Sequence, residues 1–178
     1  YALFAHCFTC GKNIAAASRL SRFLVARGFG VLRFDFTGIG NSEGDFANTD
    51  FRSNVEDLIA AAGFLADRHS GPSLLIGHSL GGTAILAAAG AIASCRAIVT
   101  IGAPLSPRHL IDRLGTSGDD TTVDLGGQTV AISADFVARH DDEQMTRTIA
   151  ELRKPLLVLH APIDEIVPVD QAGLIFRA

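Results

Sequence analysis

The sequence is short of several residue types, and each shortage narrows the range of proteins it can encode. It has no tryptophan, one tyrosine and three cysteines, an odd number that forms no complete disulfide framework. So few cysteines favour a reducing compartment, and we expect a cytoplasmic protein. The 15 lysine and arginine residues are scattered and are outnumbered by 19 acidic residues, so we expect no nucleic-acid partner.

Membrane-length apolar runs are also missing. Runs such as 74–76 and 156–159 fall far short of the roughly 20 residues needed to cross a bilayer, and they suit buried strands instead. We therefore expect no membrane segment. With 48% hydrophobic and 19% charged residues among 178, the chain has the composition of a well-cored globular unit, and we predict a single domain.

Apolar residues alternate between strand-like runs and helical spacing along the chain. Buried strands are predicted at 2–8, 31–36, 74–76, 96–103 and 156–162, and helices at 13–27, 50–69, 80–93 and from about 170. This alternation is typical of the α/β class, in which a mostly parallel central sheet carries helices on both faces.

The alternation is interrupted between 106 and 153. A hairpin around the glycine pair at 126–127 and a charged helix at about 134–152 are expected there. We interpret 106–153 as a cap inserted over the carboxyl edge of the sheet, with the core formed by 1–105 and 154–178. The chain begins without methionine, and the predicted elements lack the first strands and the last strand and helix of a complete domain, so we expect the domain to be incomplete at both ends.

The central motif is the Gly-His-Ser-Leu-Gly sequence at 77–81. An apolar run enters it and an alanine-rich segment leaves it, which is the strand, turn and helix context of a nucleophile elbow. So tight a turn has no room for a Cβ at Gly77 or Gly81, and it exposes the hydroxyl of Ser79 above the sheet. Ser79 is therefore the candidate nucleophile, and the alternative is a surface serine in a glycine-rich turn.

Other polar groups follow the predicted strands. In an open parallel sheet, ligands bind where the strands end, so residues distant in sequence meet at that edge. Asp164 follows the last predicted strand and would orient and stabilise an imidazolium there. The alternative for Asp164 is to cap a turn.

The elbow, together with the sequences at 35–42 and 160–168, resembles the α/β-hydrolase superfamily of serine hydrolases. More narrowly, residues 4–10 and 33–38 are similar to the hydrolase half of bacterial proteins that fuse such a domain to an OsmC-type domain. The resemblance implies hydrolysis of small carboxylic esters without a metal or cofactor. It is compatible with a fused or partner domain and with a homodimer.

The resemblance also implies roles for particular residues: Ser79 as nucleophile, Asp164 as acid, and the N–H groups of Phe8 and Leu80 as oxyanion donors. The superfamily places its catalytic histidine after the acid, and none follows Asp164 here. His6 is the candidate surrogate base, and its alternative role is to fix a loop by hydrogen bonding. Truncation accounts for the missing base, so we expect a weak or inactive hydrolase.

Two rival functions stay open at this point. A non-catalytic module of the same fold would bind a small molecule or a partner in the cleft. A thiol redox protein would use Cys7 and Cys10, a Cys-x-x-Cys pair between a predicted strand and a predicted helix. By themselves these cysteines supply only two thiolates, too few for a structural zinc site.

Overall fold

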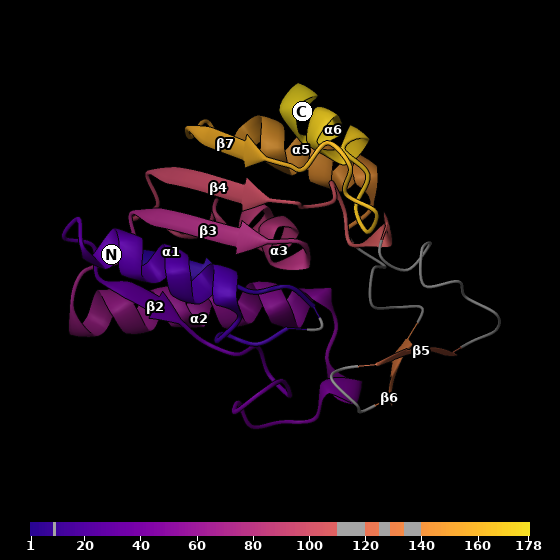
Figure 1. The fold of residues 1–178 in the computed structure, drawn as a ribbon, viewed down its shortest axis with the longest axis horizontal. Coiled ribbons are helices and arrows are strands. Elements are labelled where there is room, and N and C mark those ends of the chain that lie inside the picture. Colours follow the sequence, from indigo (N-terminus) through magenta and orange to yellow (C-terminus); the bar gives the residue numbers. More distant parts are fainter. Residues whose placement is uncertain (9, 110–119, 125–128, 134–139) are drawn as a thin grey trace.

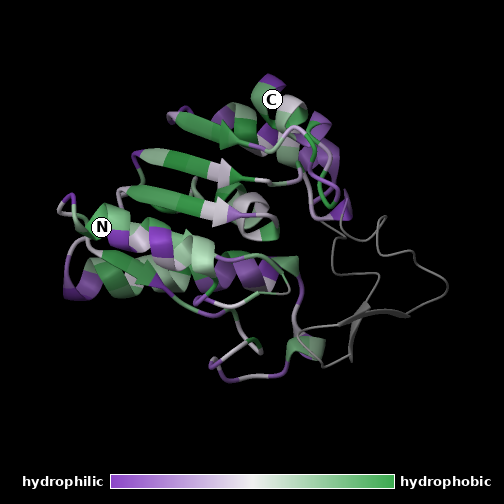
Figure 2. Ribbon diagram, in the orientation of Figure 1, coloured by the Kyte–Doolittle hydropathy of each residue, from purple (hydrophilic) through white to green (hydrophobic). Residues whose placement is uncertain are grey.

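The computed structural model describes residues 1–8, 10–109, 120–124, 129–133 and 140–178. Its main sheet is entirely parallel (Figure 1). In spatial order its strands are β2 (Val31–Arg33), β1 (Ala2–Ala5), β3 (Leu74–His78), β4 (Ala97–Ile101) and β7 (Leu156–Leu159). The predicted parallel sheet is confirmed, and the strands are hydrophobic along nearly their whole length (Figure 2).

Helices cover both faces of the sheet, as predicted. Alternate strand residues such as Phe4 and Ile76 pack against α1 (Ala15–Val25) on one face. On the other face, Leu3 and Leu75 belong to the main core. That core includes residues from the helices α2 (Phe51–Arg68), α3 (Leu80–Ala88), α5 (Asp142–Glu151) and α6 (Asp170–Arg177). None of the helices in the described ranges has the length and apolar character needed to cross a membrane.

The segment predicted as a cap is described in part. β5 (Asp120–Asp124) and β6 (Thr129–Ser133) form an antiparallel pair, which confirms the predicted hairpin. Its turn, at 125–128, and the predicted helical start at 134–139 lie outside the described residues. The helix α5 places Met145 and Ile149 in the main core beside α3, so this end of the segment packs within the core layer.

The loops that follow β1 and β2 are joined by the buried carboxylate of Asp35. It accepts hydrogen bonds from the backbone N–H of Lys12 at 2.6 Å and of Asn41 at 3.1 Å, and it pairs with the Lys12 ammonium. Burial raises the pKa of Asp35, but the hydrogen bonds from Lys12 and Asn41 outweigh burial and leave the pKa below its usual value. These contacts explain why β2 ends at Arg33, before the predicted boundary at 36.

We expect Asp35→Ala to lower the free energy of unfolding by about 2–4 kcal/mol, because it leaves a partly buried ammonium and two N–H groups without their acceptor. Glu56→Ala is the matched control, because Glu56 pairs with Arg52 at 2.8 Å on the exposed surface of α2. That loss should be about 0.5 kcal/mol or less. Urea denaturation measures both, and equal losses would contradict the structural role of Asp35.

Candidate active site

Ser79 occupies the sharp turn between β3 and α3. Its backbone has φ 53° and ψ −127°, a left-handed conformation that is rare for a residue with a side chain. Such strain costs on the order of 1–3 kcal/mol and is concentrated at functional sites. The Ser79 N–H donates to the carbonyl of Ile101 at 2.9 Å, which holds the turn against the end of β4.

The turn is possible because two glycines allow backbones to touch. A Cβ on Gly77 would overlap the carbonyl group of Gly81, and a Cβ on Gly81 would overlap the carbonyl oxygens of Ala5 and His6. The first turn of α3 therefore rests directly on β3 and on the end of β1. These are the steric conditions that a nucleophile elbow requires.

The loop after β1 carries Phe8 next to this turn. The carbonyl of Cys7 accepts hydrogen bonds from the ring Nδ1 of His6 at 2.7 Å and from the backbone N–H of Cys10 at 3.1 Å. These bonds fix the peptide whose nitrogen belongs to Phe8. A disulfide between Cys7 and Cys10, whose Cα atoms are 5.2 Å apart, closes the same turn.

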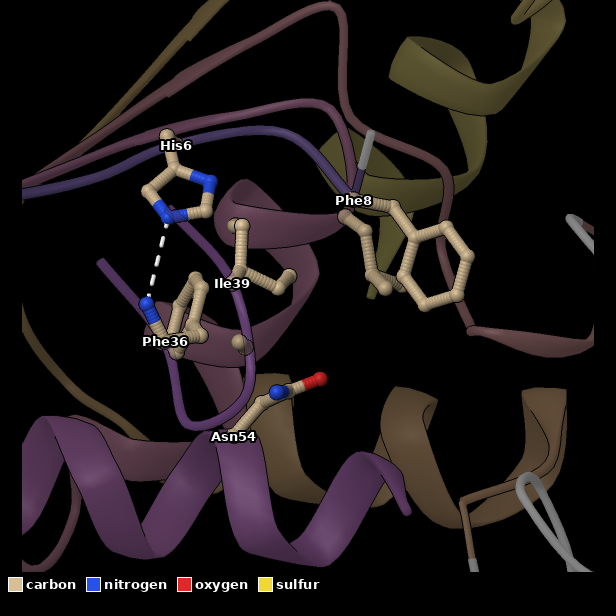
Figure 3. Close-up of a pocket in the computed structure, with 8 residues that line it drawn as sticks. His6, Phe8, Phe36, Ile39 and Asn54 are labelled. Carbon is tan, nitrogen blue, oxygen red and sulfur yellow. Dashed lines mark hydrogen bonds between the residues drawn. The ribbon is translucent and has the colours of Figure 1, made fainter. Parts of the chain in front are cut away.

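Phe8 and Leu80 border one small pocket (Figure 3). Its volume is about 10 Å³, the space of roughly one water molecule. The side chain of Asn54 points from α2 toward the part of the pocket that Ile39 and Phe8 border. The full lining consists of His6, Phe8, Phe36, Ile39, Asn54, Leu80, Gly81 and Ala84. The structure thus places Phe8 and Leu80, the residues of the two predicted oxyanion donors, at one cavity, while Ser79 and Asp164 are not among its lining residues.

His6 is completely buried and both of its ring nitrogens are engaged. Nε2 accepts from the backbone N–H of Phe36 at 3.2 Å, so the ring proton is assigned to Nδ1, which donates to Cys7 (Figure 3). Burial lowers the pKa of His6 and keeps the ring neutral. This geometry favours the role of fixing loops, because neither nitrogen is placed to take a proton from Ser79.

Asp164 lies just beyond β7, and its two carboxylate oxygens have different partners. Oδ1 accepts from the N–H groups of Ile166 and Val167, each at 2.9 Å, and these bonds hold the pKa of the carboxyl below its usual value. Oδ2 lies 3.7 Å from Nε2 of His160 and faces Gly102, directly after β4. Since Ser79 binds the neighbouring carbonyl of Ile101, both predicted catalytic residues lie at one end of β4.

Two further histidines lie at this edge of the sheet. His160 donates from Nε2 to the carbonyl of Val167 at 2.7 Å, which makes it part of the turn that holds Asp164. Burial lowers the pKa of His78, and this effect outweighs the negative charge of Asp164, which raises the pKa. Within the described ranges, Nδ1 of His78 is buried without a hydrogen-bond partner.

A parallel sheet with helices on both faces and a strained serine between a strand and a helix defines a serine hydrolase of the α/β-hydrolase class. The chain belongs to the family described as serine aminopeptidase, S33, whose model matches residues 10–117. The predicted class is therefore confirmed, while the fusion with an OsmC-type domain stays a prediction.

Several known proteins are similar to this chain. The esterase domain of a Rhodothermus marinus protein is 42% identical, with a TM-score of 0.74 over 99% of this chain and 70% of that one. Est1E of Butyrivibrio proteoclasticus, solved with ferulic acid, is 20% identical with a TM-score of 0.80 over 99% of this chain and 74% of that one, which shows the fold alone. The mouse palmitoyl-protein thioesterase ABHD10, mitochondrial, is 25% identical over 93% of this chain, which spans 59% of the relative's length.

We expect Gly81→Ala to destabilise the protein by about 1–3 kcal/mol, because the added Cβ forces the first turn of α3 away from β1. Gly63→Ala is the matched control, since Gly63 lies within α2 and an added Cβ there meets nothing within 4 Å. That variant should gain about 0.5–1 kcal/mol from helix propensity. Thermal unfolding measures both, and a stabilised Gly81→Ala would contradict the close contact.

Proposed function

We propose that this protein cleaves small carboxylic esters through an acyl-enzyme on Ser79. The observation that carries the proposal is the strained backbone of Ser79, φ 53°, between β3 and α3. A serine held in that conformation presents its hydroxyl to a substrate and directs the next N–H toward the same place. Membership of a hydrolase family and the 42% identical esterase domain support the same reaction.

The proposed reaction has two steps. The Oγ atom of Ser79 attacks the ester carbonyl carbon, and the N–H groups of Phe8 and Leu80 stabilise the oxyanion. The ester C–O bond then breaks, and the proton lost by the serine hydroxyl ends on the departing alcohol. Water then attacks the acyl-enzyme, which releases the carboxylic acid and restores the hydroxyl. Oδ1 of Asp164 is bound to its turn, so Oδ2 is the oxygen that would orient an imidazole if a catalytic histidine were supplied.

The reaction is expected to be slow for the 178-residue chain. No histidine follows Asp164, and the nitrogens of His6 are occupied by backbone groups. Without a base, the serine hydroxyl is a weak nucleophile, and loss of a triad member costs about 10⁴-fold in turnover or more. The oxyanion donors retain part of the catalysis.

The small ester class comes from the family resemblance, because the pocket beside Phe8 and Leu80 has room for about one water molecule and none for an acyl group. The pocket is lined mainly by apolar side chains and holds about 10 Å³. In the segment predicted as a cap, Met145 lies in the core, while the apolar residues at 110, 111, 114, 136 and 137 fall outside the described residues. The thioesterase name of the mouse relative makes acyl thioesters the second substrate class to test.

The purified chain should hydrolyse a short p-nitrophenyl ester slowly and react with a fluorophosphonate probe at Ser79. Ser79→Ala should lose both reactions because the nucleophile is gone. Ser94→Ala is the control, because Ser94 lies before β4 at the opposite edge of the sheet and donates to the carbonyl of Pro72. Mass spectrometry locates the probe, and a short acyl thioester is assayed in parallel.

Each contrary outcome has its own meaning. A folded chain that neither turns over ester nor takes the probe favours a binding module or a crippled hydrolase, and the proposal fails for this chain. Turnover that survives in Ser79→Ala excludes the acyl-enzyme. Fast, Ser79-dependent turnover supports the nucleophile and contradicts the expectation of a slow reaction.

A further inference from the structure

Three metal-ligating side chains meet beside the elbow. The Sγ atoms of Cys7 and Cys10 and a ring nitrogen of His78 all lie within 4.8 Å of one another. The pairing of β1 with β3 brings them together, because Ala5 lies opposite Gly77 and the chain continues from each strand in the same direction. Residues about 70 positions apart in the sequence thus form one cluster.

We propose that Cys7 and Cys10, in their reduced form, bind a thiophilic divalent cation such as Zn²⁺ together with His78. Two thiolates and an imidazole are a ligand set that zinc prefers, and they supply three of the four donors of a tetrahedral site. The fourth position is left for water or an added ligand. The fold therefore provides the third donor that the Cys-x-x-Cys pair lacks in the sequence.

The surroundings of His78 support an ion at this place. Its Nδ1 atom is buried and has no hydrogen-bond partner among the described residues, a state that a bound cation would relieve. His78 also lines an open groove of about 450 Å³ with Leu20 and Ile101, and Cys10 is partly exposed. An ion would approach the cluster from the side of Cys10 and His78, the two ligand residues that are partly exposed.

The site depends on the oxidation state of the cysteines. The structure holds Cys7 and Cys10 as a disulfide, which has no thiolate to offer. A dithiol reductant transfers two electrons and two protons to the disulfide and is itself oxidised to a disulfide. Binding of the cation then displaces the two thiol protons. Oxidation would release the ion.

The cluster also lies between two parts of the candidate active site. Cys7 and Cys10 flank Phe8, while His78 directly precedes Ser79. A bound cation would join the loop of the oxyanion donor to the turn of the nucleophile. Metal binding does not require ester hydrolysis, so it can be tested without the proposed function being correct.

The test is a cobalt titration of the chain after reduction with dithiothreitol and removal of the reductant without oxygen. We expect Co²⁺ to produce the near-ultraviolet charge-transfer band of cobalt thiolates, with saturation at a single ion per chain, and Zn²⁺ to abolish it. The oxidised chain should give no such band. A reduced wild-type chain without the band would overturn the proposal.

Variants assign the ligands. Cys7→Ser and Cys10→Ser should lose the band. His78→Asn should lower the affinity for the cation on the order of 100-fold, since loss of even an outer-shell partner costs 10–100-fold in metal affinity. Cys95→Ser is the matched control, because Cys95 is buried at the opposite end of the sheet and should change nothing. Circular dichroism checks that each variant folds. If Cys7→Ser fails to fold, the Cys10→Ser variant gives the answer, because Cys10 is partly exposed and its replacement disturbs the core less. A wild-type band in Cys10→Ser, or unchanged affinity in His78→Asn, would disprove the ligand set.

Discussion

The first turn of α3 lies so close to β1 and β3 that no side chain fits between their backbones. Gly81 rests on the carbonyl groups of Ala5 and His6, and Gly77 faces Gly81 across the elbow. This contact sets the position of Ser79 relative to the loop that carries Phe8. It also brings His78 beside the cysteines of that loop. Both the candidate active site and the proposed cation site depend on this close approach.

Local patterns in the sequence were sufficient to predict the elements and the elbow. Apolar runs and helical spacing report which face of each element is buried, and the glycine spacing around Ser79 reports a turn without room for a Cβ. No such local pattern determines the spatial order of the strands, β2-β1-β3-β4-β7. The meeting of Cys7, Cys10 and His78 therefore could not be predicted, because it follows from which strands are neighbours.

Long-range polar contacts escaped prediction for the same reason. The predicted strand at 31–36 ends early because Asp35 binds Lys12 and Phe36 donates to His6. The sequence offered Asp164 as an acid or as a turn cap, and the two oxygens of this carboxylate make both roles compatible. The cytoplasmic location and the homodimer stay predictions.

The backbone of Ser79 has a consequence for how this chain can change over generations. Glycine adopts a positive φ with little strain, whereas serine is held in that conformation by its surroundings. Folding alone would therefore be served better by a smaller residue at this place. If a lineage no longer needed the Ser79 hydroxyl, replacing the serine with glycine would not lower the stability of the fold. The persistence or disappearance of serine at position 79 in descendants of this sequence would thus report whether its chemistry is still needed.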